Sequence, residues 1–177
     1  PPIDLEAERA VLGAMIISSR VIEEVVEILE PAHFYRHNHE TIYRALVDLH
    51  NEGAPHDQIA LNNRLERDGD LARCGGHGYP FTLVQALPSV ADAEYYAGVV
   101  REKAVLRKIL TAGSGMTQEA RSGEFSPDEI IQNAYDTLEG LAGLTDAGDE
   151  DLSIGVDIMN TVAEVVDIRE NGPKEGL

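Results

Sequence analysis

Apolar residues in the first 90 positions recur at intervals of three and four, which is the period of an amphipathic helix. The segment 20–30 is the hardest to assign, because its β-branched residues favour strands. Its pattern is nevertheless helical, with one apolar face and one acidic face. The apolar face holds Ile22, Val25, Val26 and Leu29, and the other holds Glu23, Glu24, Glu27 and Glu30. We therefore predict a helix that ends before Pro31, whose ring disfavours helical geometry at the preceding residue.

Four more short helices are predicted before residue 90 from their end signals. Asp4, Asn38 and Asp57 are expected to be N-caps, because their side chains can accept hydrogen bonds from the first turn. The second of these helices should end at Gly53. A turn-rich stretch at 75–80 precedes a short helix, Phe81 to Leu87. The expected inward residues are Val11, Leu12, Met15, Ile16, Ile42, Tyr43, Leu46, Leu49, Leu61 and Leu65.

Beyond residue 90 the pattern changes to that of a long helical hairpin. Helical spacing continues from Asp92 to about Arg121, and Ser126-Pro127-Asp128-Glu129 then forms a capping box at the start of another helix. Each helix carries an apolar seam through which it can pack on the other. The seams are Leu106, Ile109, Gly113, Met116 and Ala120 on the first helix, and Ile131, Ala134, Leu138 and Leu141 on the second.

The hairpin has more apolar surface than one pair of seams can cover. Val105, Leu110, Ile130 and Tyr135 lie off the seams, and a second chain would be their natural cover. We therefore predict self-association through this region. The residues expected to take part are Val105, Leu106, Ile109, Leu110, Gly113, Met116, Ile130, Ile131, Tyr135, Leu138 and Leu141.

The C-terminal part of the sequence combines an acidic segment with a final helix. Residues 145–151 hold four acids in seven positions and are typical of a flexible linker. Helical spacing resumes over 152–171, and Asn171-Gly172-Pro173 should stop it. No further domain follows to receive the apolar stripe of this helix, so we predict that it docks on another surface. The stripe consists of Val156, Met159, Val162 and Val166.

These patterns predict an all-α protein made of a small helical head, a long helical hairpin and a separate linker helix. The predicted parts are the head (1–98), the hairpin used for dimerisation (99–144), the acidic linker (145–151), the linker helix (152–171) and a short lead-in (172–177) to a domain that is not in the chain.

Charge and composition narrow the possible functions. The 14 basic residues against 32 acidic residues give a net charge of −18, which argues against DNA binding by this chain alone, because phosphate contacts need clustered Lys and Arg. No run approaches the roughly 18 apolar residues that cross a bilayer, and no secretory signal opens the sequence. The single cysteine, Cys74, excludes an internal disulfide framework. We expect a cytoplasmic protein.

No catalytic motif is recognisable. The phosphate-binding G-x-x-x-x-G-K-[ST] run, the G-x-S-x-G elbow and the H-E-x-x-H zinc motif are all absent, so we assign no catalytic, cofactor-binding or metal-binding residue. A zinc site built from His37, His39, Cys74 and His77 is conceivable, because these are ligand types that zinc uses. His56-Asp57 resembles a dipeptide of metal-dependent phosphohydrolases, but Asp57 is better explained as an N-cap.

An ordered set of short motifs resembles the N-terminal part of bacterial replicative helicases of the DnaB type. The set covers residues 1–105, and the later helices are similar only in architecture. The motifs are Pro1-Pro2-x-x-Leu5-Glu6-Ala7-Glu8, Val11-Leu12-Gly13, Phe34-Tyr35-Arg36-x-x-His39, Gly53-x-Pro55-x-Asp57, Leu71 with Gly75-Gly76, Pro88-Ser89, Glu94-Tyr95-Tyr96-Ala97 and Val100-Arg101-Glu102-Lys103-Ala104.

The resemblance implies a collar module of a ring-shaped helicase. Hairpins would pair into dimers, three dimers would form the collar of a hexamer, and the linker helix would dock on a neighbouring motor domain. Primase would be a partner at the replication fork, with a helicase loader as a further candidate. The full-length protein would be an ATP-dependent 5′–3′ DNA helicase that uses ATP and Mg²⁺ and contacts single-stranded DNA mainly through the motor, which this chain lacks. No membrane partner is implied.

Three alternatives stay open at this point. The chain could be a stand-alone helical adaptor with no motor in its gene. It could be a small metal-dependent hydrolase that uses the histidine cluster. It could also be a helix-turn-helix regulator, although its negative charge disfavours DNA binding.

Overall fold

A computed structural model describes residues 1–142, apart from the side chains of residues 139, 141 and 142. The described residues form helices and no strands, which confirms the all-α prediction. The elements in order are α1 (Leu5–Ile17), α2 (Ser19–Val26), the 3₁₀ turn η1 (Pro31–His33), α3 (His37–Asn51), α4 (Gln58–Arg67), α5 (Tyr79–Gln85), the 3₁₀ turn η2 (Val90–Asp92), α6 (Ala93–Ser122) and α7 (Pro127–Ala142). None of the described helices is long and apolar enough to cross a membrane. The predicted acidic linker (145–151), linker helix (152–171) and lead-in (172–177) lie outside the described residues.

The chain divides into two compact units, Pro1–Thr111 and Ala112–Leu177. The first unit extends past the predicted head boundary at residue 98, because α6 continues to pack on the small helices after that point. Val100 and Ala104 of α6 are buried, and the Arg107 side chain bonds to backbone carbonyls near the N-terminus and in η1.

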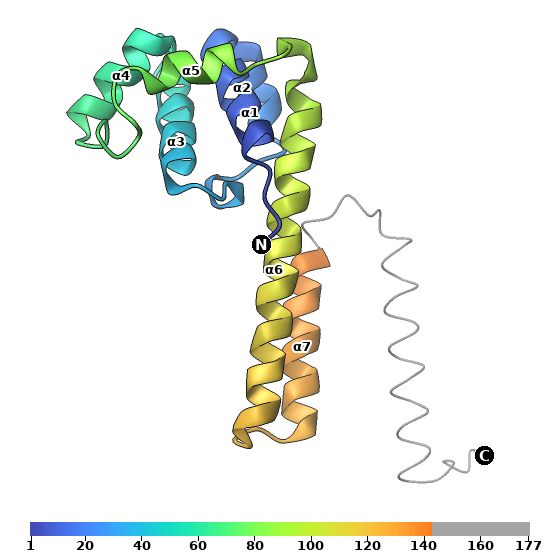
Figure 1. The fold of residues 1–177 in the computed structure, drawn as a ribbon. Helices are drawn as coiled ribbons and strands as arrows, with labels where there is room; N and C mark the ends of the chain where they lie inside the picture. The colour runs from blue at the N-terminus through green and yellow to red at the C-terminus, as the bar shows by residue number, and fades with distance from the viewer. Residues whose placement is uncertain (143–177) are drawn as a thin grey trace, which may run out of the picture. The chain divides into compact units, whose positions relative to one another are not determined.

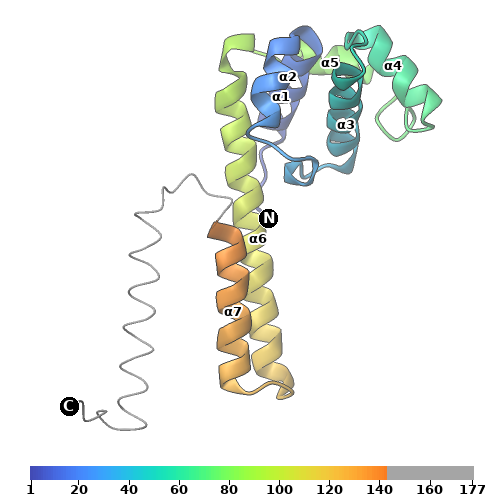
Figure 2. The same ribbon diagram turned by 180° about the vertical axis from the view of Figure 1, so that it is seen from behind.

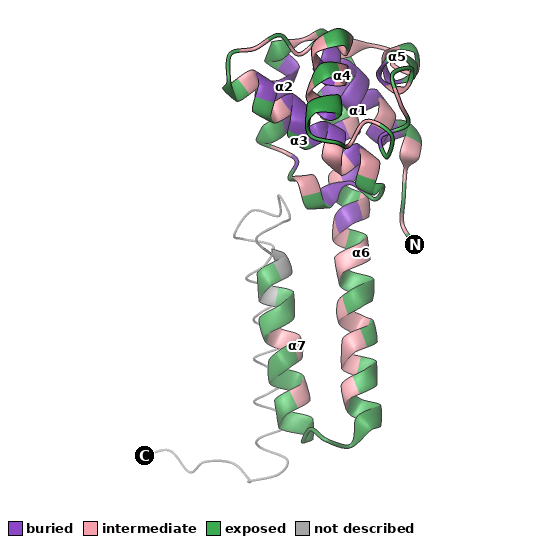
Figure 3. Cartoon of the chain, turned by 90° about the vertical axis from the view of Figure 1, so that its left-hand side faces the viewer, coloured by how far each residue is buried: buried purple, intermediate pink, exposed green. Residues whose placement is uncertain are grey.

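The core of the first unit gathers around α1, which is flanked by α2, α3, α5 and the first part of α6 (Figures 1 and 2). Figure 3 shows the buried positions concentrated in these helices. The predicted inward residues are all buried: Val11, Leu12, Met15, Ile16, Ile42, Tyr43, Leu46, Leu49, Leu61 and Leu65.

Two of the three predicted N-caps are confirmed. Asp4 Oδ1 accepts the N–H of Ala7 at 2.9 Å, and Asp57 Oδ1 accepts the N–H groups of Ile59 and Ala60, each at 2.9 Å. The third prediction is wrong, because α3 begins at His37, one residue before Asn38, and no side chain caps it.

Two helix boundaries differ from the predictions. Helix α2 ends at Val26, and Val26 is exposed although its spacing suggested an inward position. Leu29 is still buried beyond the helix end, where the Tyr43 hydroxyl donates to its carbonyl at 2.6 Å and holds the chain in place. Helix α5 begins at Tyr79, two residues before the predicted start at Phe81, because a proline such as Pro80 is tolerated in the first turn of a helix. Phe81 is exposed.

Gly13 allows α1 and α5 to pack backbone against backbone. A Cβ atom at Gly13 would lie 2.3 Å from the carbonyl oxygen of Leu83 in α5, which is far inside van der Waals contact. Only glycine fits this position without moving one of the two helices. The glycine of the Val11-Leu12-Gly13 motif therefore sets the distance between α1 and α5.

A buried polar network joins α1, α3 and α5. Glu8 and His39 are both fully buried, and Glu8 Oε2 lies 2.5 Å from His39 Nδ1. The other Glu8 oxygen accepts the N–H of Tyr35 at 2.6 Å, and His39 Nε2 lies 2.7 Å from the Tyr79 hydroxyl. Each polar atom in this chain of contacts has a partner, which is the condition under which a buried carboxylate and imidazole are tolerated.

The described part of the second unit is an antiparallel hairpin made of the end of α6 and α7 (Figure 1). The predicted capping box is present at the start of α7. Glu129 Oε2 accepts the N–H of Ser126 at 2.8 Å, and Ser126 Oγ accepts the N–H of Glu129 at 3.4 Å. These contacts lower the pKa of Glu129, because they favour its charged form.

Candidate interaction surfaces

The hairpin of the second unit leaves its apolar residues largely uncovered. None of its described side chains, from residue 112 to 138 and at 140, is buried. Ile131 is 63% exposed, and Leu138 and Phe125 are each 41% exposed. Phe125 was not predicted as a surface residue, although a phenylalanine in a four-residue connection between helices is a usable signal. Isolated exposed apolar residues are ordinary, but a group of them on one pair of helices marks a candidate interaction surface.

Two residues of the predicted seam on α7, Ile131 and Leu138, are exposed, whereas a third, Ala134, is half-buried. Ile130, one turn before Ala134, was predicted to lie off the seam and is half-buried. Tyr135, which was also predicted to lie off the seam, is half-buried. The side chain of Leu141 lies outside the described set.

The second-unit part of α6 carries two glycines and a methionine. Gly113 and Met116 are half-buried. A Cβ atom at Gly113 or Gly115 would meet nothing within 4 Å among the described residues outside the adjoining backbone of α6. Asn133 Nδ2 donates to Glu119 Oε2 at 3.3 Å and makes a polar link between the two helices.

The last turns of α6 in the first unit also carry exposed apolar residues. Leu106, Ile109 and Leu110 are 38%, 44% and 56% exposed, while Val105 is half-buried. The predicted self-association residues with described side chains are thus all outside the buried core, in one unit or the other. The four predicted docking residues of the linker helix, Val156, Met159, Val162 and Val166, lie outside the described residues.

Arg107 binds α6 to two other segments of the first unit. Its Nη1 donates to the carbonyl of Pro2 at 3.0 Å, and its Nη2 donates to the carbonyl of His33 at 2.6 Å. The guanidinium also lies over the ring of Tyr35, 5.6 Å from the ring centroid. We call this arrangement the Arg107 joint. The sequence did not predict it, because its partners are backbone atoms more than 70 residues away.

His33 is the buried member of the Arg107 joint. Only 3% of its surface is exposed, and its Nδ1 accepts the N–H of Glu30 at 3.1 Å. Its Nε2 is buried and has no hydrogen-bond partner among the described residues. Burial lowers the pKa of His33, and the positive charges of Lys108, Arg101 and Arg107 lower it further, against an opposing effect of Glu30.

The candidate zinc ligands do not form a site. His39 is engaged by Glu8 and Tyr79, while His37 is exposed beside Glu40. The Cys74 thiol lies 3.9 Å from the carbonyl of Asn38, and burial raises its pKa to about 11, which keeps it protonated at neutral pH. Over residues 1–142, no three His, Cys, Asp or Glu side chains are placed to hold a metal ion.

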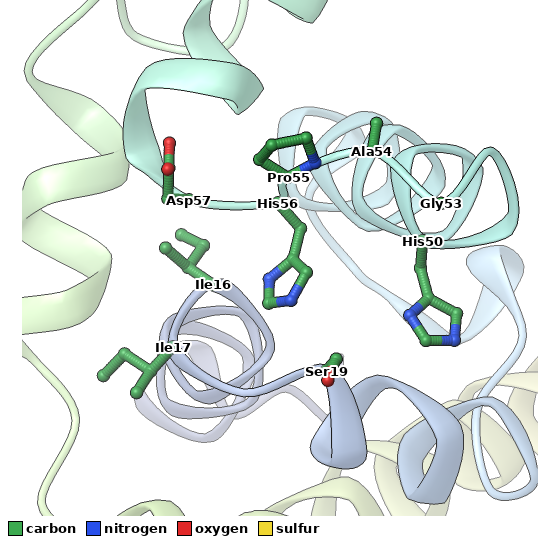
Figure 4. Close-up of a pocket in the computed structure, with 9 residues that line it drawn as sticks. All are labelled: Ile16, Ile17, Ser19, His50, Gly53, Ala54, Pro55, His56 and Asp57. Atoms are coloured by element: carbon green, nitrogen blue, oxygen red, sulfur yellow. The ribbon is translucent and has the colours of Figure 1, made fainter.

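An open groove of about 560 Å³ lies between the end of α1, the start of α2 and the loop before α4 (Figure 4). Its lining is Ile16, Ile17, Ser19, His50, Gly53, Ala54, Pro55, His56 and Asp57. His50 and His56 come from opposite ends of the loop, and His50 Nε2 lies 3.7 Å from Glu23. Asp57 Oδ1 caps α4, and no group of three His, Cys, Asp or Glu side chains that could hold a metal ion includes His56 or Asp57 among the described residues.

Known protein sequences similar to this chain support the fold described above. Residues 1–102 match the family described as the DnaB-like helicase N terminal domain. The chain is 41% identical to the replicative DNA helicase DnaB of Mycobacterium leprae over 145 residues, which is 78% of this chain and 24% of that protein. It is 32% identical to the replicative DNA helicase DnaC of Bacillus subtilis over 142 residues, which is 80% of this chain and 31% of that protein. The chain thus spans about a quarter to a third of these relatives.

Solved structures give the same result. The crystal structure of the N-terminal domain of DnaB helicase from Mycobacterium tuberculosis aligns with a TM-score of 0.75 at 39% identity, covering 79% of this chain and 99% of that one. A DnaB-like replicative helicase, solved to show its interactions with primase, shares the fold with a TM-score of 0.63 at 23% identity, over 88% of this chain and 35% of that one. The family match and the close structural match show that the chain belongs to the DnaB-like helicase N-terminal domain family.

Proposed function

We propose that this chain is the assembly module of a replicative DNA helicase and that it pairs with a second copy through its hairpin. The single observation that carries the proposal is the second unit, in which none of the described side chains is buried. Two helices that cannot cover their own apolar residues gain free energy when another chain covers them. The family assignment supports the same role, because its members are parts of replicative helicases.

The module has no chemistry of its own in this proposal. Glu8 and His39 are engaged in the buried network, and Asp57 caps α4. ATP and Mg²⁺ would bind to a motor domain beyond residue 177, and single-stranded DNA would be contacted mainly there. The net charge of −18 supports this division, since a strongly acidic module repels phosphate.

Primase is the proposed external partner, and the cytoplasmic replication fork is the proposed location. The support comes from a structural neighbour that was solved to show its interactions with primase. A hexamer built as three dimers would present several copies of the first unit to such a partner. A helicase loader is a further candidate partner of the same collar.

Hairpin pairing can be tested with two matched substitutions. Ile131→Glu places a charge on the exposed face of α7, and Ile59→Glu places the same charge at a 73% exposed position of α4 in the first unit. We expect Ile131→Glu to weaken the dimer at least tenfold in sedimentation equilibrium, because a charged group would be buried in the interface. Ile59→Glu should associate like the unchanged protein. Equal dimerisation of all three proteins would contradict the proposal.

A further inference from the structure

The ring of His33 is held in one protonation state by its surroundings. Because Nδ1 accepts the N–H of Glu30, Nδ1 carries no hydrogen. The neutral ring must therefore carry its hydrogen on Nε2, the atom that is buried without a partner among the described residues. A proton added to Nδ1 would face the hydrogen of the Glu30 N–H, so the charged ring does not fit the present arrangement.

Protonation of His33 would also meet positive charge on α6. The charges that act on the ring are those of Lys108, Arg101 and Arg107, with Glu30 opposing them. On α3, which also packs against η1, the Tyr43 phenol stays neutral because burial raises its pKa to about 12. From the N-terminal segment, Asp4 is occupied as the cap of α1. A charged ring would thus be a buried cation near three half-buried cations.

The backbone of His33 connects this ring to the position of α6. Its carbonyl is one of the two acceptors of Arg107, at 2.6 Å, and its ring closes the capping contact at the start of η1. If the ring turns away from Glu30, the 3₁₀ turn opens and its last carbonyl moves. Arg107 then loses its shorter hydrogen bond.

We propose that His33 is a proton-operated latch that binds α6 to η1 and the N-terminal segment when neutral and releases it when protonated. The latched form binds the proton less readily than the released form, so the joint should open as the pH falls below about 6.5, the ordinary pKa of histidine. The latch lies within the first unit, so its failure would leave the proposed hairpin pairing untouched.

Amide hydrogen exchange of the 177-residue chain at pH 7.5 and pH 5.5 tests the latch, with rates corrected for the intrinsic effect of pH. We expect protection over 30–36 and 101–111 to fall at the lower pH, by up to about tenfold, which is the limit that linkage sets one unit below the ordinary pKa. His33→Asn keeps an acceptor near Nδ1 but cannot be charged, so its protection should not change with pH. Equal protection of the unchanged protein at both pH values, or a pH response that persists in His33→Asn, would overturn the proposal.

Three further measurements keep the test decisive. His37→Asn, at an exposed histidine four residues away, should keep the full pH response. Arg107→Lys retains the charge but lacks the two guanidinium nitrogens that each donate to one carbonyl, so protection should already be low at pH 7.5. If His33→Asn does not fold, ¹⁵N NMR of the unchanged protein reports the tautomer directly. A hydrogen on Nε2 at pH 7.5 is expected, and a hydrogen on Nδ1 would overturn the latch.

Discussion

At the residue scale, the first unit depends on polar side chains that are buried with their partners. Glu8 is 1% exposed and accepts from the Tyr35 N–H while it contacts His39. The roles of the two His39 ring nitrogens depend on the tautomer, and the tautomer with a hydrogen on Nδ1 donates it to Glu8 Oε2. The Tyr79 hydroxyl can then donate to the opposite nitrogen of the neutral ring. The Glu8 carboxylate thereby connects α1 to the segment at Tyr35 and to α3.

Replacing Glu8 should be much more damaging than replacing its exposed neighbour. Glu8→Leu would leave the Tyr35 N–H and the His39 ring unpaired in the core, and each unpaired group costs about 1–3 kcal/mol. Glu6→Leu removes only a surface pair with Arg9 and should change the free energy of unfolding by less than about 0.5 kcal/mol. Urea unfolding followed by circular dichroism measures both. Similar midpoints for the two variants would refute a structural role of the network.

The Cys74 thiol should react slowly in the folded protein. Burial and the nearby Asp70 raise its pKa from 9.0 to about 11, so the reactive thiolate is about a hundredfold scarcer at pH 8. We expect labelling by a thiol-specific disulfide reagent to be at least that much slower in buffer than in urea, and to accelerate as the pH rises toward 11. Rapid stoichiometric labelling of the folded protein at pH 8 would contradict the buried position.

At the scale of elements, the contact between α1 and α5 is set by a missing side chain. Gly13→Ala would push a methyl group against the backbone of Leu83 and should destabilise the protein by about 1–3 kcal/mol. Gly98→Ala is a matched control in α6, because a Cβ there meets nothing within 4 Å. It should stabilise the protein by up to about 1 kcal/mol, since alanine favours helix. The melting temperature should therefore fall for Gly13→Ala and rise for Gly98→Ala. A change in the same direction for both variants would contradict the packing of α1 on α5.

The elements also show what the sequence could and could not predict. An N-cap side chain bonds to a backbone N–H only two or three residues later, so caps can be predicted from spacing alone. This was the case for Asp4, Asp57 and Ser126. The start of α3 at His37 was missed, because that helix begins without a side-chain cap. The face of α7 was misjudged because Ile130 and Ile131 are equally apolar neighbours. Only the partner helix decides between them.

Contacts between distant segments were beyond sequence analysis. Arg107 bonds to carbonyls 105 and 74 residues away, and carbonyls are present at every residue, so no pattern marks the pair. The Glu8 and His39 contact is similar, because each residue alone resembles a surface group. Leu106, Ile109 and Ile131 were predicted to lie on the seams between the hairpin helices, but all three are exposed.

At the scale of the whole molecule, the proposed helicase role extends to residues 152–171. Changing Val156, Met159 and Val166 to polar residues should weaken hexamers of the full-length protein, because these residues form the predicted docking stripe. The 177-residue chain with the same changes should keep its folded head and its dimer. Native mass spectrometry measures both assemblies. Undiminished hexamers would remove the docking role and leave hairpin pairing unaffected.

The central claim is that this chain presents more apolar helix surface than it can bury and completes its packing with a second copy. Sedimentation equilibrium of the 177-residue chain from low to high micromolar concentration tests it most directly. The account predicts a reversible monomer–dimer equilibrium with the dimer dominant at the upper end. A chain that sediments as a monomer throughout this range would contradict it.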